Sequence, residues 1–110
     1  MALVACCASL RPSYTIVVRN STGQAIDDAT VSWQGFTSVA GGSMFAGVWS
    51  SDNFIRVPLP PRASVSWRTR QDGKSFRKEV EIPEGLPRNF KGKLTFELFQ
   101  DGRVDVRAER

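Results

Sequence analysis

Residues 64–82 read SVSWRTRQDGKSFRKEVEI, and this stretch contains the strongest signal for the fold. Apolar and polar residues alternate on both sides of the central Asp72-Gly73, and a period of two is typical of half-buried strands. Asp-Gly favours a two-residue hairpin turn, which would place Val65 opposite Val80. The stretch therefore predicts an antiparallel hairpin whose apolar side chains share one face.

A second hairpin is predicted at 92–108. A two-residue turn at Asp101-Gly102 would place Leu98 opposite a charged residue, so it does not fit the alternation. A three-residue loop with a left-handed Gly102 instead places Leu98 opposite Val104 and keeps the apolar residues on one face.

Shorter alternating runs at 14–19 and 30–33 are separated from these hairpins by clusters rich in Gly, Pro, Asp and Ser. Nowhere does a helical period of 3.6 persist. We therefore expect a single all-β domain over 13–110, built as an antiparallel β-sandwich of about seven strands.

The composition excludes several kinds of chemistry. The chain has 110 residues, no histidine, and two cysteines that are adjacent, Cys6 and Cys7. Adjacent cysteines do not close a useful disulfide loop, and a cysteine-based zinc site needs more ligands. Without histidine or an evident pair of carboxylates, no general acid–base machinery is indicated. We expect no catalytic residue, no metal and no cofactor, and hence a protein that is not an enzyme.

Two segments match the pattern of a known family. The run VRNSTGQAIDDATVSWQG at 18–35 has a strand, a turn with Gly, and then Ala-x-Val on the next strand. Phe54-Ile-Arg-Val is followed by a proline-rich turn and by the alternating ASVSW at 63–67. Together these segments resemble the carboxypeptidase-regulatory-like domains, also called prealbumin-like or transthyretin-like sandwiches, which have an Ig-like architecture.

This resemblance covers roughly 14–82 and specifies a fold rather than a chemistry. It implies an accessory or binding role, since such domains are seldom catalytic themselves. The family usually has Gly before the aromatic residue, whereas this chain has Asn53, which also tolerates left-handed geometry.

The first residues carry a second resemblance. Leu-Val-Ala-Cys at 3–6 is similar to a bacterial lipobox, in which the cysteine is lipidated and becomes the mature N-terminus. This implies lipidation of Cys6, a truncated signal and tether over 1–12, and a periplasmic, membrane-anchored protein. With such an N-terminus, the chain resembles small lipoproteins of unknown function in Gram-negative bacteria. The alternative is a cytoplasmic protein in which Cys6 is unmodified, since a reducing cytosol tolerates free thiols.

The C-terminal half is basic. Residues 56–110 carry thirteen basic and eight acidic side chains, against two and three in the first half. Arg68, Arg70, Lys74 and Arg77 fall on the first predicted hairpin, where the two-residue turn would place Arg68 opposite Arg77. They are candidates for binding an acidic protein partner. The alternative is a solvated face whose charges are screened by neighbouring glutamates.

Residues 35–53 hold four of the nine glycines together with Met44, Phe45 and Trp49. Methionine and aromatic side chains on a glycine-rich loop make an adaptable binding surface. The alternative is a glycine-broken strand from Met44 to Ser50 that buries Phe45 or Met44, together with Val48 and Trp49.

The sequence thus favours a non-catalytic, protein-binding module, for example an immunity protein that blocks an acidic secreted effector toxin. The alternatives are a module that binds glycan or peptidoglycan through Trp49 and Phe45, and an assembly subunit that uses its sheet edges. Nucleic acid is not expected as a partner, because most aromatic residues fall on inward positions. The sequence predicts neither the partner's identity nor the oligomeric state.

Overall fold

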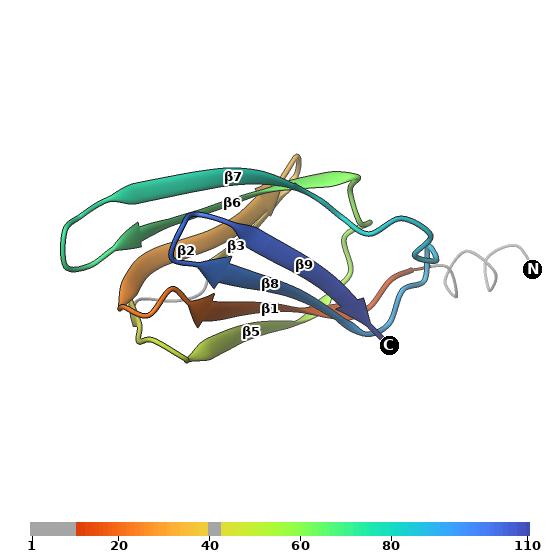
Figure 1. The fold of residues 1–110 in the computed structure, drawn as a ribbon. Helices are drawn as coiled ribbons and strands as arrows, with labels where there is room; N and C mark the ends of the chain where they lie inside the picture. The colour runs from red at the N-terminus through yellow and green to blue at the C-terminus, as the bar shows by residue number, and fades with distance from the viewer. Residues whose placement is uncertain (1–10, 40–42) are drawn as a thin grey trace, which may run out of the picture.

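A computed structural model of the chain describes residues 11–39 and 43–110, which form two packed β-sheets (Figure 1). The strands are β1 (Tyr14–Ser21), β2 (Ile26–Trp33), β3 (Phe36–Val39), β4 (Ser43–Met44), β5 (Trp49–Ile55), β6 (Arg62–Thr69), β7 (Ser75–Glu81), β8 (Lys93–Phe99) and β9 (Val104–Glu109). One sheet has the order β5-β1-β8-β9, and the other has the order β3-β2-β6-β7, with β4 also paired to β2.

The predicted all-β sandwich is confirmed, with two differences in detail. The described residues contain nine strands rather than about seven, because β3 and β4 are too short to show a period in the sequence. The sandwich is mostly antiparallel, but β1 and β8 run parallel along seven residue pairs. No hairpin links those two strands, so their direction could not be inferred from a local turn.

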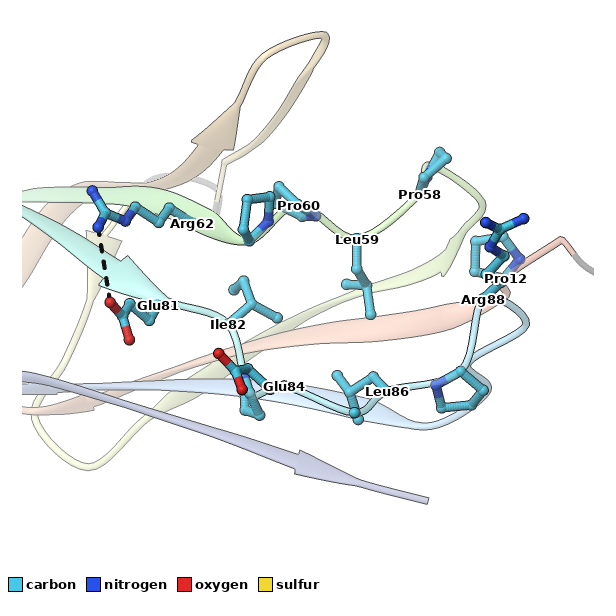
Figure 2. Close-up of a pocket in the computed structure, with 14 residues that line it drawn as sticks. Pro12, Pro58, Leu59, Pro60, Arg62, Glu81, Ile82, Glu84, Leu86 and Arg88 are labelled. Carbon is cyan, nitrogen blue, oxygen red and sulfur yellow. Dashed lines mark ion pairs between the residues drawn. The ribbon is translucent and has the colours of Figure 1, made fainter.

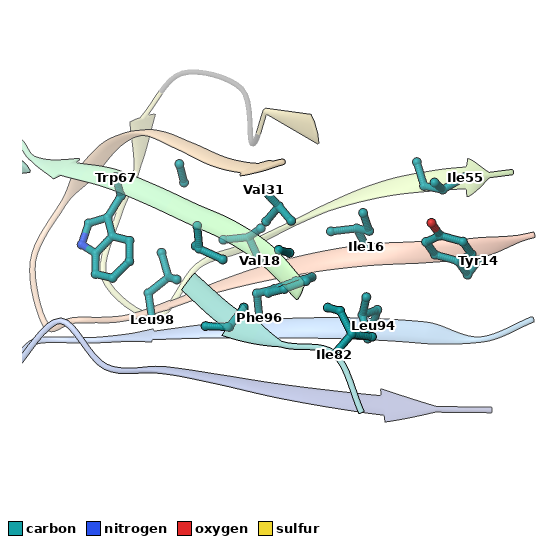
Figure 3. Close-up of a cluster of buried hydrophobic side chains, with 14 of the residues drawn as sticks. Tyr14, Ile16, Val18, Val31, Ile55, Trp67, Ile82, Leu94, Phe96 and Leu98 are labelled. Carbon is teal, nitrogen blue, oxygen red and sulfur yellow. The ribbon is translucent and has the colours of Figure 1, made fainter. Parts of the chain in front are cut away.

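The core lies between the sheets and follows the predicted alternation (Figure 3). Every second residue of β1 from Tyr14 onward is buried, and β8 of the same sheet and β6 of the facing sheet supply further apolar side chains. The fully buried set includes Ile16, Val31, Val65, Leu94, Phe96 and Leu98. Each such side chain stabilises the fold by about 1.5–3 kcal/mol relative to exposure.

The hairpin at 64–82 forms, but its register differs from the prediction by two residues. Val65 lies opposite Lys78, and the loop contains the four residues 70–73. Thr69 and Asp72 explain the wider turn: the Thr69 hydroxyl and the Lys74 amide both donate to the Asp72 carboxylate. The same bonds hold the pKa of Asp72 below its usual range. An even shift preserves the apolar face, so side-chain alternation could not reveal it.

The predicted pairing of Arg68 with Arg77 is therefore wrong. Arg68 lies opposite Ser75, and Arg77 lies opposite Ser66. The wider turn moves the two arginines apart along the ladder, and no like-charge pair forms at this position.

The second hairpin has the predicted register. Leu98 lies opposite Val104, and Phe96 lies opposite Val106. Gly102 has a φ of 87°, in the left-handed region that favours glycine. A methyl group on Gly102 would also lie 3.2 Å from Cδ1 of Phe76.

Gly102→Ala is expected to destabilise the protein more than Gly73→Ala. Both glycines have positive φ, which costs alanine about 1–2 kcal/mol, but a Cβ on Gly73 would have no neighbour within 4 Å. Phe76 cannot move away freely because it is stacked on Trp67 with a centroid distance of 5.2 Å. Denaturant unfolding of both variants measures the difference, and equal losses of stability would show that Phe76 yields without cost.

Candidate functional site

Four turns gather at the end of the sandwich that is remote from both termini (Figure 1). We call this region the turn end; it comprises residues 20–25, 44–49, 69–74 and 99–103. The first three segments are joined by hydrogen bonds between main-chain groups, including Arg70 N to Ala25 O at 3.0 Å. The turn end therefore holds the glycine-rich segment and the tip of the basic hairpin side by side.

Asn20, at the end of β1, is the buried centre of the turn end. Its Nδ2 lies 2.8 Å from Gln24 O, 3.0 Å from Met44 O and 3.1 Å from Phe45 O, and donates toward all three carbonyls. Its Oδ1 accepts from the Thr22 amide and hydroxyl. Asn20 is completely buried, and this network satisfies a polar side chain that would otherwise be costly to bury.

The main chain of Asn20 holds the 45–48 turn as well. Its N–H donates to Val48 O at 2.9 Å, and its carbonyl accepts from Gly47 N at 2.9 Å. Gly47 has a φ of 79°, which lets the turn close. One residue thus anchors both sides of the turn that presents Phe45.

The side chains singled out in the glycine-rich segment differ in their exposure to solvent. Met44 is 2% exposed and packs in the core, as the core-strand interpretation expected. Phe45 is 63% exposed and Trp49 is 60% exposed, as the binding-surface interpretation expected. The segment therefore divides at a single residue, with Met44 supporting the core and Phe45 lying on the surface.

The basic side chains of the hairpin are largely paired. Arg70 lies 3.2 Å from Asp27 and Arg68 lies 3.2 Å from Asp28, both on the neighbouring strand β2. Arg77 lies 3.9 Å from Glu79, the screening arrangement that the solvated-face interpretation expected. These pairs are partly or fully solvated, so each contributes at most about 1 kcal/mol. The sequence did not reveal Asp27 and Asp28 as partners, because they are forty residues away along the chain.

Arg70 also contacts Phe45, and this contact joins the two regions that were predicted separately. Its Cζ lies 5.9 Å from the centroid of the Phe45 ring. The same end of the molecule has Lys74 over Phe76 at 5.2 Å and Arg103 over Phe99 at 4.3 Å. A cation within about 6 Å of an aromatic face is attracted to it. The turn end is thus an aromatic surface interleaved with cations, whereas Arg77 lies further along β7.

A hollow lies at the end of the sandwich opposite the turn end (Figure 2). It has a volume of about 780 Å³ and is lined by all six prolines of the chain, with Leu59, Ile82 and Leu86 between them. Next to the lining Pro58, the Tyr14 hydroxyl donates to Val57 O at 2.7 Å, and burial raises the pKa of this phenol. In the sequence these prolines fall in turns and connecting segments, and no local pattern predicts that they converge.

A shallow depression of about 190 Å³ lies on the outer face of the β5-β1-β8-β9 sheet. Trp49 forms one side of it, and Arg19, Lys93 and Arg107 lie around it. Glu97 accepts hydrogen bonds from Arg107 and Ser21, so part of this charge is balanced.

Cys6, the predicted lipidation site, and most of the predicted tether over 1–12 lie outside the described residues. Within 11–39 and 43–110, no group of three His, Cys, Asp or Glu side chains could hold a metal ion. Across the same residues, no helix is long and apolar enough to cross a membrane.

Comparison with known proteins supports the fold at a coarse level. The structure is similar to the NMR structure of a protein from Eubacterium rectale, with a TM-score of 0.59, 18% sequence identity and coverage of 89% of each chain. No family model matches the chain, and no curated protein matches it either. The chain is thus a two-sheet β-sandwich domain that shares its architecture with a bacterial protein, and the prealbumin-like resemblance stays a prediction.

Asn20→Asp is expected to destabilise the protein by about 3 kcal/mol, because a carboxylate would face three carbonyl oxygens with no hydrogen to donate. The matched control is Asn53→Asp, on the exposed surface of β5. There the Oδ1 atom already accepts from Thr15, and an oxygen can do the same. Chemical denaturation measures both variants, and hydrogen exchange of the Gly47 amide reports the turn itself. A loss below 1 kcal/mol for Asn20→Asp would contradict this role.

Proposed function

We propose that this protein is a non-catalytic, protein-binding module and that the turn end, centred on Phe45, is its contact surface. The observation that carries the proposal is the distribution of exposed apolar side chains. Five large hydrophobic side chains are highly exposed among the described residues, and three of them, Phe45, Val48 and Trp49, lie on the turn end. Exposed apolar side chains that gather at one end of a domain are typical of interaction sites.

Phe45 has the properties of an interface anchor. It is exposed, yet its main chain is held by the buried Asn20 network, so little conformational entropy is lost when a partner covers it. Arg70 lies beside it, and aromatic and arginine side chains are enriched among the residues that dominate binding energy. The cations around Phe45, Phe76 and Phe99 favour a partner with acidic groups near an apolar pocket.

The position of the turn end is compatible with the predicted lipid anchor. Cys6 precedes Pro12 by six residues, a span of at most about 20 Å, and Pro12 lines the hollow at the opposite end. Under the proposal of a periplasmic lipoprotein, the turn end would therefore point away from the membrane. An immunity protein that binds a secreted toxin is one function of this kind, and the prealbumin-like pattern likewise supports a binding role.

A specific observation favours glycan binding as a second candidate. Trp49 borders the depression on the outer face of the sheet, where Arg19 and Lys93 approach it. A sugar ring can stack on an exposed tryptophan, while arginine and lysine bind carboxylates. The ligand class would be an acidic oligosaccharide.

Phe45→Ala is expected to weaken partner binding at least about tenfold, since truncation of an anchoring aromatic side chain costs more than about 1.4 kcal/mol. A photo-crosslinking residue placed at position 45 in the native host identifies the partner, and affinity is then measured with purified proteins. Val39→Ala is the control, because Val39 is 56% exposed but lies on β3, away from both the turn end and β5. Unchanged affinity in Phe45→Ala would remove the turn end from the binding surface.

The glycan alternative predicts that an oligomer of hexuronic acid binds in titration calorimetry and that Trp49→Ala abolishes the signal. Arg19→Gln is expected to weaken binding at low salt, because it removes one cation from the depression. Equal heats for the wild-type protein and Trp49→Ala would eliminate this candidate.

A further inference from the structure

The two sheets have four edges among the described residues, and the strands at three of them resist pairing with another chain. β7 carries Arg77, Lys78, Glu79 and Glu81, and Lys78 occupies an inward position opposite Val65. β9 carries three charged side chains among its six residues. β3 has only four residues. Charges, inward-pointing lysines and short lengths are the means by which natural sheets prevent edge-to-edge association.

β5 has less of this protection, which is confined to one charge and to the bulge before Ile55. It spans seven residues, WSSDNFI, with Asp52 as its single charge, and it has no proline. Residues 51–54 are all exposed, and β5 is the outermost strand of its sheet (Figure 1). Within the described residues, no strand pairs with the side of β5 that faces away from β1.

The phase of the hydrogen bonds shows which groups of β5 are free. Asn20 N donates to Val48 O, so the pair of Asn20 and Val48 is of the hydrogen-bonded kind. Such pairs alternate along an antiparallel ladder, and β1 and β5 stay in register as far as Ile16 and Asp52. The main-chain groups of Trp49 and Ser51 therefore point away from β1, toward the open side.

We infer that two copies of this chain associate through antiparallel pairing of β5 with β5 about a two-fold axis at Ser51. The free groups of Ser51 then bond to those of Ser51 in the second copy. Ser50 lies opposite Asp52, and Trp49 lies opposite Asn53, so no like charges face each other. The two four-stranded sheets become one continuous sheet, and the contact is isologous.

Phe54 supports this register. It has a φ of 60°, which is unfavourable for a bulky side chain, and its ring is 83% exposed. It lies in a bulge, where the register between β1 and β5 shifts between Tyr14 and Ile16, and bulges re-aim side chains. In the paired arrangement, Phe54 lies across from Val48 of the second copy, which is also exposed. The dimer would thus cover apolar side chains that the single chain leaves in water.

The inference goes beyond the proposed function. It shares Val48 and Trp49 with the turn end, but Phe45 and Arg70 lie off the β5 ladder, so variants at 45 and 51 test the two proposals separately. The test places a charge of either sign at position 51.

The wild-type protein is expected to have twice the chain mass of 12.2 kDa by sedimentation or light scattering at high concentration. Ser51→Lys and Ser51→Glu should each be monomeric there, with at least tenfold weaker self-association, because like charges would meet at the axis.

An equimolar mixture of Ser51→Lys and Ser51→Glu should restore the dimer, since opposite charges then face each other. Ser75→Lys, the same change on exposed β7, should remain dimeric. Circular dichroism confirms that each variant is folded. A monomeric wild-type protein, a dimeric Ser51→Lys variant, or a mixture that stays monomeric would each overturn the inference. Ser51→Lys should lose the dimer and keep partner binding, whereas Phe45→Ala should keep the dimer and lose partner binding. The inference and the proposed function can therefore fail separately.

Discussion

The buried amide of Asn20 is the interaction on which the turn end depends. A side-chain amide with no access to water must satisfy its hydrogen-bonding groups within the protein. Asn20 meets this requirement through carbonyls of two separate turns, so both turns are held to the end of β1. The result is a surface aromatic residue, Phe45, whose backbone is held by buried hydrogen bonds.

The excess of positive charge has a structural explanation that composition alone does not reveal. The arginines of the hairpin tip are paired with aspartates of β2, because β2 and β6 are adjacent in the sheet. Other charges lie on the edge strands β7 and β9, and charges at a sheet edge disfavour pairing with another chain. The basic half of the chain is therefore not a bare cationic patch, and three of its cations, Arg70, Lys74 and Arg103, lie beside aromatic rings at the turn end.

The two ends of the sandwich are built in different ways. At one end the prolines restrict the connections and offer no backbone N–H groups, which leaves a hollow with rigid walls. At the other end glycines permit tight turns that bring exposed aromatic side chains together with cations. β1 links the two, since Tyr14 holds the proline-lined end and Asn20 holds the turn end.

The sequence by itself determined the fold class, the two hairpins and most of the core, because side-chain alternation and Asp-Gly turns act over a few neighbouring residues. It also determined the register at Gly102, where only one loop length keeps the apolar face. It could not determine the register at Gly73, since a shift of two residues leaves that face unchanged and the Thr69–Asp72 contact decides the turn. Only the tertiary structure decided the parallel pairing of β1 with β8, the division between Met44 and Phe45, and the contact of Phe45 with Arg70. These features join residues that are distant in the chain or depend on a buried amide, and no local pattern encodes such a meeting.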